Sequence, residues 1–459
     1  MGRRIIIDLS SGIQSTDDQP LSQGKPNPHW KGRTLLIHTP QSTETVIIIR
    51  ALDTIRREKV EGEWFRHLPA HVGHTQALDF SIKALVAACA YARDIPQLTS
   101  RDCYQALALA LRAVQANMNQ SLGELSDDIL ASTALLAPFE GVLNKHGVPT
   151  CLHVEGLAAI LAARPSTFPI TQLAREIFDF YACDSAVMAC IQGVPSPFET
   201  VSRSYFASNG IGCDGSDRAK LKAFGSELFV RIPRLVGLVR TLRLYSSPQI
   251  PLLWHAFSLS KSLLQLQDPQ AEQRLLRSIK LYPKSLANAT SPVSHSLHFT
   301  SVDDFEALAY YWQNRLTLLR LEQNLHELAV SGDTQVDDGT DESRAPLHPS
   351  FRPKANEVHR LVKNIMMCAD YAATLPLRKH DRLFSYAMVS VWGVMKDVPT
   401  ALAHLQGREG MDALSSLLLR NVNIALSAKP PLTSKDMDMA ADIFVGGQPK
   451  GRFVKLYGL

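Results

Sequence analysis

The sequence predicts an all-α fold, with one large helical domain behind a short N-terminal extension. Apolar residues recur at spacings of three and four from about residue 74 to about residue 425, which is the period of an amphipathic helix. No β-strand pattern interrupts this region, and no strict repeat of short period divides it. The lack of strands favours an all-α domain over a mixed fold, and the lack of a repeat disfavours a helical-repeat solenoid.

The composition is that of a folded protein without a strong charge excess. Of 459 residues, 45% are hydrophobic and 20% are charged, which is too apolar for a largely disordered chain. The formal net charge is only +4, and no dense basic block is present to neutralise many phosphates. The seven scattered cysteines, and the lack of a signal-peptide core or a membrane-spanning apolar run, predict a soluble intracellular protein with reduced thiols.

Residues 1–65 differ from the rest and are predicted to form a weakly structured extension. Two β-branched runs, Ile5–Ile7 and Val46–Ile49, flank a polar stretch that contains four prolines. Such runs favour short strands, which could pair as one β-hairpin. Residues 66–459 then form the helical domain, with a disordered insertion at residues 331–354 that is rich in Asp, Gly, Ser and Pro.

Two uninterrupted apolar stripes mark the first helices of the domain. They consist of Leu78, Ile82, Leu85, Val86 and Cys89, and of Tyr104, Leu107, Leu111, Val114 and Met118. Each stripe predicts a helix with that face toward the core. Leu111 lies at the centre of the second stripe and is therefore expected to be buried.

Capping residues, prolines and further stripes predict the remaining helices. Ser126, followed by two acidic residues, predicts the start of a helix that is kinked at Pro138. Pro233 is predicted to begin another helix. The other predicted helices follow the stripes Val154 to Leu161, Leu173 to Tyr181, Phe305 to Leu319, Val358 to Cys368 and Phe384 to Trp392.

Several segments together resemble the fungal-specific transcription factor domain, the regulatory region that usually follows a zinc binuclear cluster. The resemblance is clearest from Ala77 to Glu199, through CYQALALALRAVQANM, SDDILASTALLAPFEGVL, HVEGLAAILAARP and AREIFDFYACDSAVMACIQGVPSPF. The third segment is similar to the family's His-x-x-Gly-x-x-x-Leu-Leu element, with His153, Gly156, Ile160 and Leu161 at the matching positions. Weaker similarity extends to about residue 425, and the resemblance implies an all-α regulatory domain.

The chain departs from this family in its N-terminal region. The family's DNA-binding module needs six cysteines in a short basic segment to hold two zinc ions, and residues 1–88 contain no cysteine. We therefore expect no direct specific DNA binding from this chain. The departure leaves three origins open: a divergent regulator, a product of module loss, or a truncated gene model of a zinc-cluster activator.

Cysteine, glycine and histidine patterns that could carry chemistry favour structural explanations. Cys183 and Cys190 are two helical turns apart, about 10 Å along a helix axis, which is too far for a shared tetrahedral zinc site. The G-x-G-x-x-G pattern at residues 210–215 lacks a convincing preceding strand, so an interhelical loop is favoured. No metal or catalytic motif accompanies the four histidines considered, which are His71, His74, His146 and His153.

Two basic segments are candidates for interaction surfaces. One contains Arg231, Arg234, Arg240 and Arg243, and the other is LRKHDR at Leu377 to Arg382. The arginines alternate with leucines, which is also what a solvated helix face requires. The second segment is short for a nuclear-import signal.

The sequence thus predicts no enzyme, and no catalytic, cofactor-binding or metal-binding residues. The resemblance implies a transcription regulator in the nucleus, acting through protein partners of the transcription machinery, a DNA-binding regulator or a small-molecule effector. The alternative from a different class is an interaction protein that kept the fold and lost the regulatory role. The purified chain is expected to hold no stoichiometric zinc, because structural zinc normally needs four closely placed Cys or His ligands and no cluster in the sequence offers them.

Overall fold

The computed structural model confirms the all-α class. It describes residues 48–49, 62–93, 98–120, 125–143, 152–164, 170–201, 216–245, 249–284, 293–333, 355–375, 380–397, 407–426 and 430–457. These residues contain 15 α-helices, two short 3-10 helices and one two-stranded antiparallel hairpin. Among the described helices, none combines the length and the apolarity that crossing a membrane requires.

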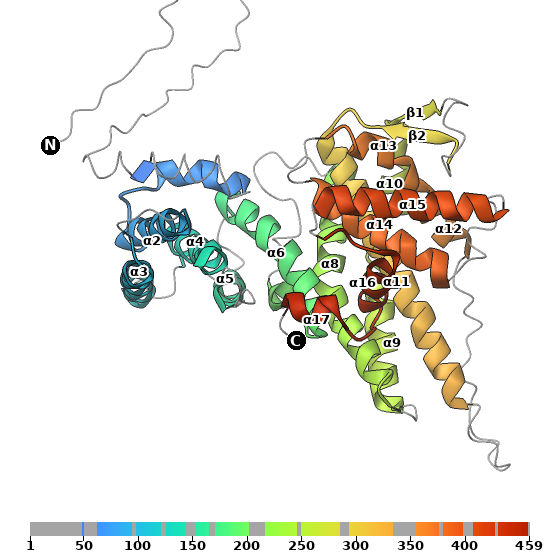
Figure 1. The fold of residues 1–459 in the computed structure, drawn as a ribbon, viewed down its shortest axis with the longest axis horizontal. Coiled ribbons are helices and arrows are strands. Elements are labelled where there is room, and N and C mark those ends of the chain that lie inside the picture. Colours follow the sequence, from blue (N-terminus) through green and yellow to red (C-terminus); the bar gives the residue numbers. More distant parts are fainter. Residues whose placement is uncertain are drawn as a thin grey trace, which may run out of the picture.

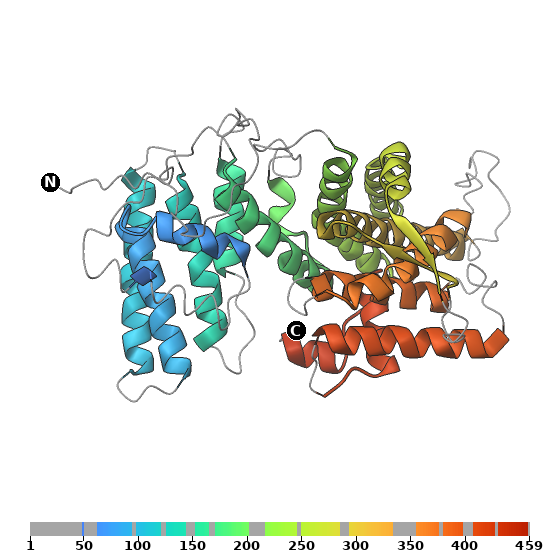
Figure 2. The same ribbon diagram turned by 90° about the horizontal axis from the view of Figure 1, so that it is seen from above.

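The helices form two lobes that are joined by α6 (Figures 1 and 2). The N-terminal lobe has its own hydrophobic core, and α2 packs against both α3 and α4 in it. Its elements are η1 (Glu63–Ala70), α2 (Gln76–Ala92), α3 (Ser100–Gln120), α4 (Asp127–Leu143), α5 (Leu152–Ala163) and η2 (Pro197–Thr200).

The C-terminal lobe is built around α11, which contacts α8, α9, α12 and α14. Every residue from Tyr311 to Glu322 is buried, so this part of α11 has no solvent-facing stripe. The other elements are α8 (Asp217–Leu242), α9 (Ile250–Leu264), α10 (Pro269–Arg277), β1 (Lys280–Pro283), β2 (His295–His298), α12 (Ala355–Met367), α13 (Ala369–Ala372), α14 (His380–Asp397), α15 (Gly407–Leu426), α16 (Ser434–Ile443) and α17 (Arg452–Tyr457), and α11 itself is Val302–Asp333.

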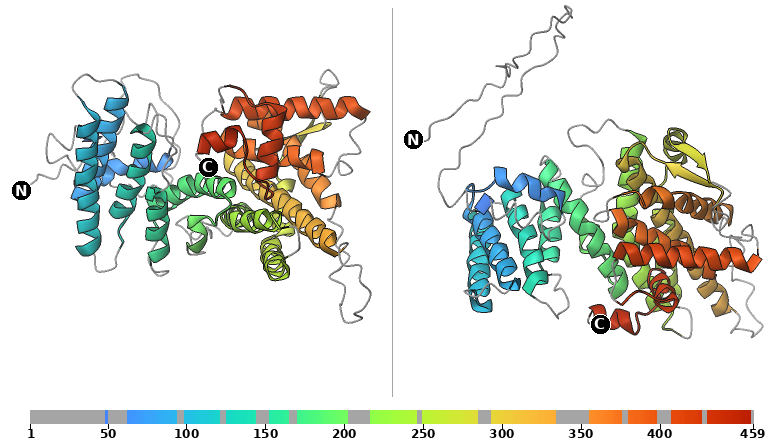
Figure 3. Two further views of the ribbon diagram at one scale, coloured as in Figure 1. Left: turned by 60° about the horizontal axis from the view of Figure 1, so that its bottom comes forward. Right: turned by 45° about the horizontal axis from the view of Figure 1, so that its top comes forward.

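The connecting helix α6 (Gln172–Gln192) belongs to both lobes (Figure 3). Ile177 and Phe178 in its first half lie in the core of the N-terminal lobe. Val187 and Ile191 in its second half pack with Phe229 of α8 in the C-terminal lobe. The helix begins at the side chain of Thr171, which accepts a hydrogen bond from the Ala174 N–H, and it ends at Gly193 with a left-handed backbone.

Most of the predicted apolar stripes are confirmed. Those of α2, α6, α11, α12 and α14 lie in helices and face the cores, with Val86 half-buried and Cys368 buried in the turn that follows α12. Ser126 also begins α4 as predicted, because its hydroxyl accepts a hydrogen bond from the Ile129 N–H at 3.4 Å.

The prediction for α3 is wrong for three of the five stripe residues, because the helix is rotated relative to that stripe, whereas Val114 is buried and Leu107 packs against the core as predicted. Tyr104, Leu111 and Met118 are exposed by 55%, 42% and 39%, although all three were expected in the core. The helix instead buries Cys103 and Ala110, together with Val114. Small side chains on that face allow α3 to pack closely on α2, since the distance between helix axes depends on the side chains at the contact.

Two predictions about chain breaks in the C-terminal lobe are also wrong. Pro233 does not begin a helix but lies within the 26-residue α8, which starts after a Ser216 cap whose hydroxyl accepts from the Ala219 N–H. Strands β1 and β2 interrupt the region that was expected to contain helices alone, and they pair in an antiparallel register. The strands are only four residues each, too short to give a period-two signal.

The boundaries of the predicted N-terminal extension and insertion also change. Ile48 and Ile49 are helical rather than extended, and Ile48 is buried in the N-terminal core. The fold includes Trp64 and Phe65 of η1, which the boundary at residue 65 had placed outside the domain. Residues 331–333 of the predicted insertion continue α11, whereas residues 334–354 and the run Ile5–Ile7 lie outside the described residues.

Replacing a glycine inside a helix by alanine usually stabilises the helix. At Gly237, where α6 and α8 cross closely, we expect the same replacement to destabilise the protein. A Cβ on Gly237 would lie 2.5 Å from the Gly193 carbonyl oxygen, which is backbone and cannot rotate away. We expect Gly237→Ala to lower the free energy of unfolding by about 1–3 kcal/mol. In chemical denaturation, Gly156→Ala is the matched control, because its Cβ has only an ordinary contact at 3.9 Å and should stabilise α5 by up to about 1 kcal/mol. Stabilisation by both variants would contradict the tight crossing.

Candidate functional site

The outer face of α3 is an exposed apolar surface, defined here as the α3 face and formed by Tyr104, Ala108, Leu111 and Met118. These residues follow one another at spacings of four, three and seven, so they lie along one side of the helix. Leu109, which is also exposed, adds to the apolar surface beside them. Helix α3 lies at the end of the N-terminal lobe away from the C-terminal lobe (Figures 1 and 2). The α3 face is therefore accessible along its length.

The sequence builds this face because α3 carries two apolar stripes instead of one. The face with Cys103 and Ala110 is buried on α2, and Tyr104, Leu111 and Met118 are left toward solvent. Large exposed side chains that share one helix face are typical of a protein interaction surface. The sequence analysis assigned the larger stripe to the core because its residues recur at helical spacing.

Basic side chains accompany the α3 face. Arg101 and Arg112 are both exposed on α3. The Arg112 Nε donates a hydrogen bond to the Ala108 carbonyl oxygen at 3.2 Å, which holds this side chain along the helix surface. Asp102 is engaged locally, since its carboxylate accepts hydrogen bonds from the backbone N–H and the hydroxyl of Thr99. The face therefore combines apolar side chains with guanidinium groups.

A second candidate is a pocket of about 690 Å³ between α10, α11 and α12. Its lining is polar and already paired: the Arg360 guanidinium binds the Glu272 carboxylate, and Arg315 binds the Glu357 carboxylate at 2.8 Å. Burial raises the pKa of Tyr311 to about 12, so its hydroxyl stays protonated. With its acids and bases balanced, the pocket suits a small neutral polar molecule better than an ion.

The basic segment on α8 is used inside the protein. Arg231 pairs with Glu227, Arg234 with Glu199 and Arg243 with Asp442, at 3.1, 3.0 and 2.9 Å. Arg240 is buried, and its guanidinium donates hydrogen bonds to the carbonyl oxygens of Cys190 at 2.7 Å and Ile191 at 2.8 Å. These four arginines therefore do not form a free basic face. Of the other basic segment, Leu377–Lys379 lie outside the described residues.

Both cysteines proposed as structural lie on α6, and Cys190 is buried. Burial raises the pKa of the Cys190 thiol to about 12, which keeps it protonated and unsuited to metal binding. Cys183 is half-buried and packs near Tyr310. The G-x-G-x-x-G pattern at residues 210–215 lies outside the described residues.

Of the four histidines considered, two come together in space. His71 and His74 lie in the turn between η1 and α2, next to Asp128 in the first turn of α4. The hydrogen bond between His71 Nδ1 and Asp128 Oδ1, at 2.7 Å, raises the pKa of His71 above its ordinary value against the opposing effect of burial. His153 lies on α5 and is not a member of this group, and His146 is outside the described residues.

Comparison with protein-family models, with characterised proteins and with solved structures gives no match to this chain. The class of protein is therefore defined by its own architecture, which is a two-lobed all-α protein. Its candidate sites are the α3 face and the polar pocket of the C-terminal lobe.

Proposed function

We propose that this protein is a non-enzymatic regulator of transcription in the nucleus, and that it acts by binding a protein partner through the α3 face. The exposed stripe of Tyr104, Leu111 and Met118 is the observation that carries the proposal. The resemblance of residues 77–199 to fungal regulatory domains supports the transcriptional role, and it includes α3 itself.

The partner is an amphipathic helix with acidic flanks. Tyr104, Leu111 and Met118 are seven residues apart, so they form a row of large apolar side chains along one side of α3, which suits another helix packed alongside it. Arg101 and Arg112 would then face acidic residues of the partner, which fixes orientation and speeds association more than it adds affinity. Such a segment would belong to the transcription machinery or to a DNA-binding regulator.

Recruitment to DNA by another protein is favoured over direct binding. Sequence-specific recognition needs an element that reaches base edges, with free basic groups that hold it on the phosphates. The four arginines of α8 that came closest to such an element have intramolecular partners. This supports a partner that supplies the specificity.

A small-molecule effector is a second candidate, and the α10–α11–α12 pocket favours it. The pocket volume of about 690 Å³ falls within the range of ligand sites, about 300–1,000 Å³. Its balanced charges favour a neutral polar molecule, and ligand binding there would act on α11 at the centre of the C-terminal lobe.

The regulatory role can be tested by tethering the chain to a promoter. We expect a fusion to a heterologous DNA-binding domain to change transcription of a reporter gene in a fungal host. The double variant Leu111→Glu and Met118→Glu should reduce this effect about tenfold, because charges on the contact would remove more than about 1.4 kcal/mol of binding free energy. Trp254→Glu, at an exposed apolar residue on α9, is the control for introducing charge on another helix and should leave the reporter unchanged.

The same α3 variants should fold normally. Because Leu111 and Met118 are exposed by 42% and 39% and lie outside the core, we expect each change to alter the free energy of unfolding by no more than about 0.5 kcal/mol. An unchanged melting temperature with loss of the reporter effect would support an interaction surface. A reporter that does not respond to the wild-type fusion, or responds equally to the α3 variant, would contradict the proposal.

A further inference from the structure

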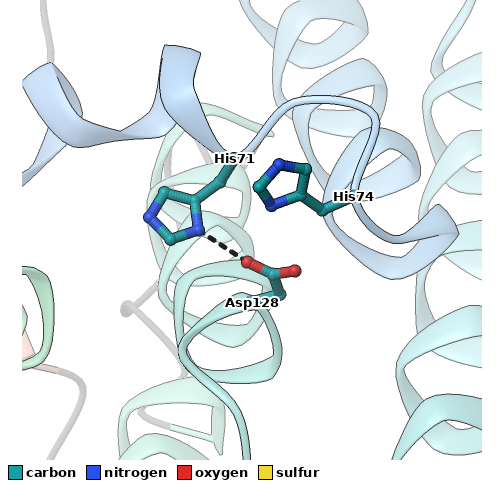
Figure 4. A group of neighbouring side chains, drawn as sticks. All are labelled: His71, His74 and Asp128. Atoms are coloured by element: carbon teal, nitrogen blue, oxygen red, sulfur yellow. Dashed lines mark hydrogen bonds and ion pairs between the residues drawn. The ribbon is translucent and has the colours of Figure 1, made fainter. Parts of the chain in front are cut away.

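Three side chains with metal-ligating atoms converge at one edge of the N-terminal lobe. One ligand atom from each of His71, His74 and Asp128 lies within 4.8 Å of the others (Figure 4). His71 Nδ1 and Asp128 Oδ1 are closest, at 2.7 Å. Among the described residues, His71, His74 and Asp128 form a group of metal-ligating side chains that lie close enough together to bind one ion.

The backbone holds the two histidines on the same side of their turn. The His71 N–H bonds to the Leu68 carbonyl at the end of η1, and the His74 N–H bonds to the His71 carbonyl at 3.1 Å. Gly73 lies between them with a φ of 85°, a left-handed conformation that reverses the chain direction. Immediately after His74, Thr75 caps α2. The histidines are therefore anchored by a helix on each side.

The third side chain comes from a separate helix and is held equally well. Asp128 is in the first turn of α4, and its side chain is 13% exposed. The neighbouring Asp127 carboxylate points to the Arg164 guanidinium at 2.9 Å, so its charge is balanced there. Asp128 is thus the carboxylate of this helix end that faces the histidines (Figure 4).

Two imidazoles and one carboxylate match the ligand preferences of divalent transition metals. In a tetrahedral zinc site with bonds of about 2.0–2.1 Å, neighbouring ligand atoms lie about 3.3 Å apart. The distances here, from 2.7 Å to at most 4.8 Å, bracket that value. His74 is exposed, so its ring can rotate to shorten the longer distances. Its exposure also leaves a coordination position for solvent.

We propose that His71, His74 and Asp128 form an open, exchangeable site for a divalent transition-metal ion, with Zn²⁺ the best match. The ion takes the place of the proton shared between His71 and Asp128, and that proton leaves to solvent. Three protein ligands and a solvent molecule complete the coordination. This proposal departs from the sequence-based expectation of no metal-binding residues, because the three ligands come together only in the fold. The site is independent of the α3 face.

Zinc titration of the metal-free full chain, followed by calorimetry, tests the site. We expect one Zn²⁺ to bind per chain and a mild chelator to remove it. His74→Ala should weaken binding at least about tenfold, since a ligand is lost from a side chain that makes little contribution to packing. Asp128→Asn should weaken it similarly, whereas His255→Ala, at an exposed histidine of α9, should have no effect.

Cobalt gives an independent readout. Co²⁺ bound to two imidazoles and a carboxylate in a four-coordinate site should give visible d–d absorption. His74→Ala should abolish this absorption, and added Zn²⁺ should remove it by displacing Co²⁺. The lack of saturable binding at millimolar zinc would overturn the site. So would stoichiometric binding that His74→Ala and Asp128→Asn leave unchanged.

Discussion

Arg240→Ala is expected to lower the free energy of unfolding by about 3–5 kcal/mol, because one buried guanidinium holds the C-terminal ends of two helices. It donates hydrogen bonds to the Cys190 and Ile191 carbonyls at the end of α6, and a longer one of 3.4 Å to the Ile443 carbonyl at the end of α16. The last carbonyls of a helix have no intrahelical partner and carry its negative dipole end. Each charge-assisted hydrogen bond lost costs about 1.5–3 kcal/mol, although the losses do not add fully.

Arg234→Ala is the matched control on the same helix. Arg234 is 43% exposed at its side chain and forms one ion pair with Glu199, so its loss should cost less than about 1 kcal/mol. Chemical denaturation of both variants by circular dichroism measures the difference. Equal losses would show that Arg240 does not act as a shared helix cap.

Trp312→Ala is expected to have an effect of similar size, about 3–5 kcal/mol, because it leaves a large cavity in the core of the C-terminal lobe. Trp312 is fully buried in the centre of α11 and packs in the largest hydrophobic cluster of that lobe. Its indole Nε1 also donates a hydrogen bond of 2.7 Å to the Glu272 carboxylate.

Trp312→Phe separates the two contributions. Phenylalanine keeps most of the apolar contact but leaves the buried Glu272 carboxylate without this donor, which should cost about 1.5–3 kcal/mol. The free energy of unfolding should therefore be highest for the wild type, lower for Trp312→Phe and lowest for Trp312→Ala. A phenylalanine variant as unstable as the alanine variant would contradict a large contribution from apolar packing.

The parts of the fold that the sequence predicts are those in which a single apolar stripe determines the buried face. Val358, Leu361 and Ile365 of α12 are helical and buried as expected, because the opposite face of this helix carries exposed polar residues such as Arg360 and Lys363. On α3 the same reasoning fails. Both of its faces are apolar, and the choice between them depends on how closely α2 approaches, which periodicity does not contain.

Local rules about proline also fail where tertiary packing compensates. Proline at a helix start costs nothing, so Pro233 was taken as a first residue. The structure buries Pro233 inside α8, where contacts with α6, α9 and α11 offset the hydrogen bond that proline cannot donate. The Ser216 cap, which was present in the sequence, is the signal that would have placed the start of the helix correctly.

The candidate sites were harder to predict because they depend on residues far apart in the chain. Asp128 is 57 residues from His71, so no motif spacing connects them. In the α10–α11–α12 pocket, the ion pair between Glu272 and Arg360 links residues that are 88 positions apart in the sequence. Likewise, the alternation of arginine and leucine on α8 shows which residues share a face, but not that Arg240 turns inward to the carbonyls of α6.

The position of α6 leads us to expect that the two lobes unfold as a single cooperative unit. Its 21 residues extend about 31 Å, and each half has its apolar contacts in a different lobe. A helix of this length has little stability in water by itself. Unfolding of either lobe would remove the contacts that keep one half of α6 helical. Loss of helix in that half would then weaken the contacts that the other half of α6 makes in the second lobe. Thermodynamic stability gained in one lobe is consequently shared with the other through the continuous backbone hydrogen bonds of this helix.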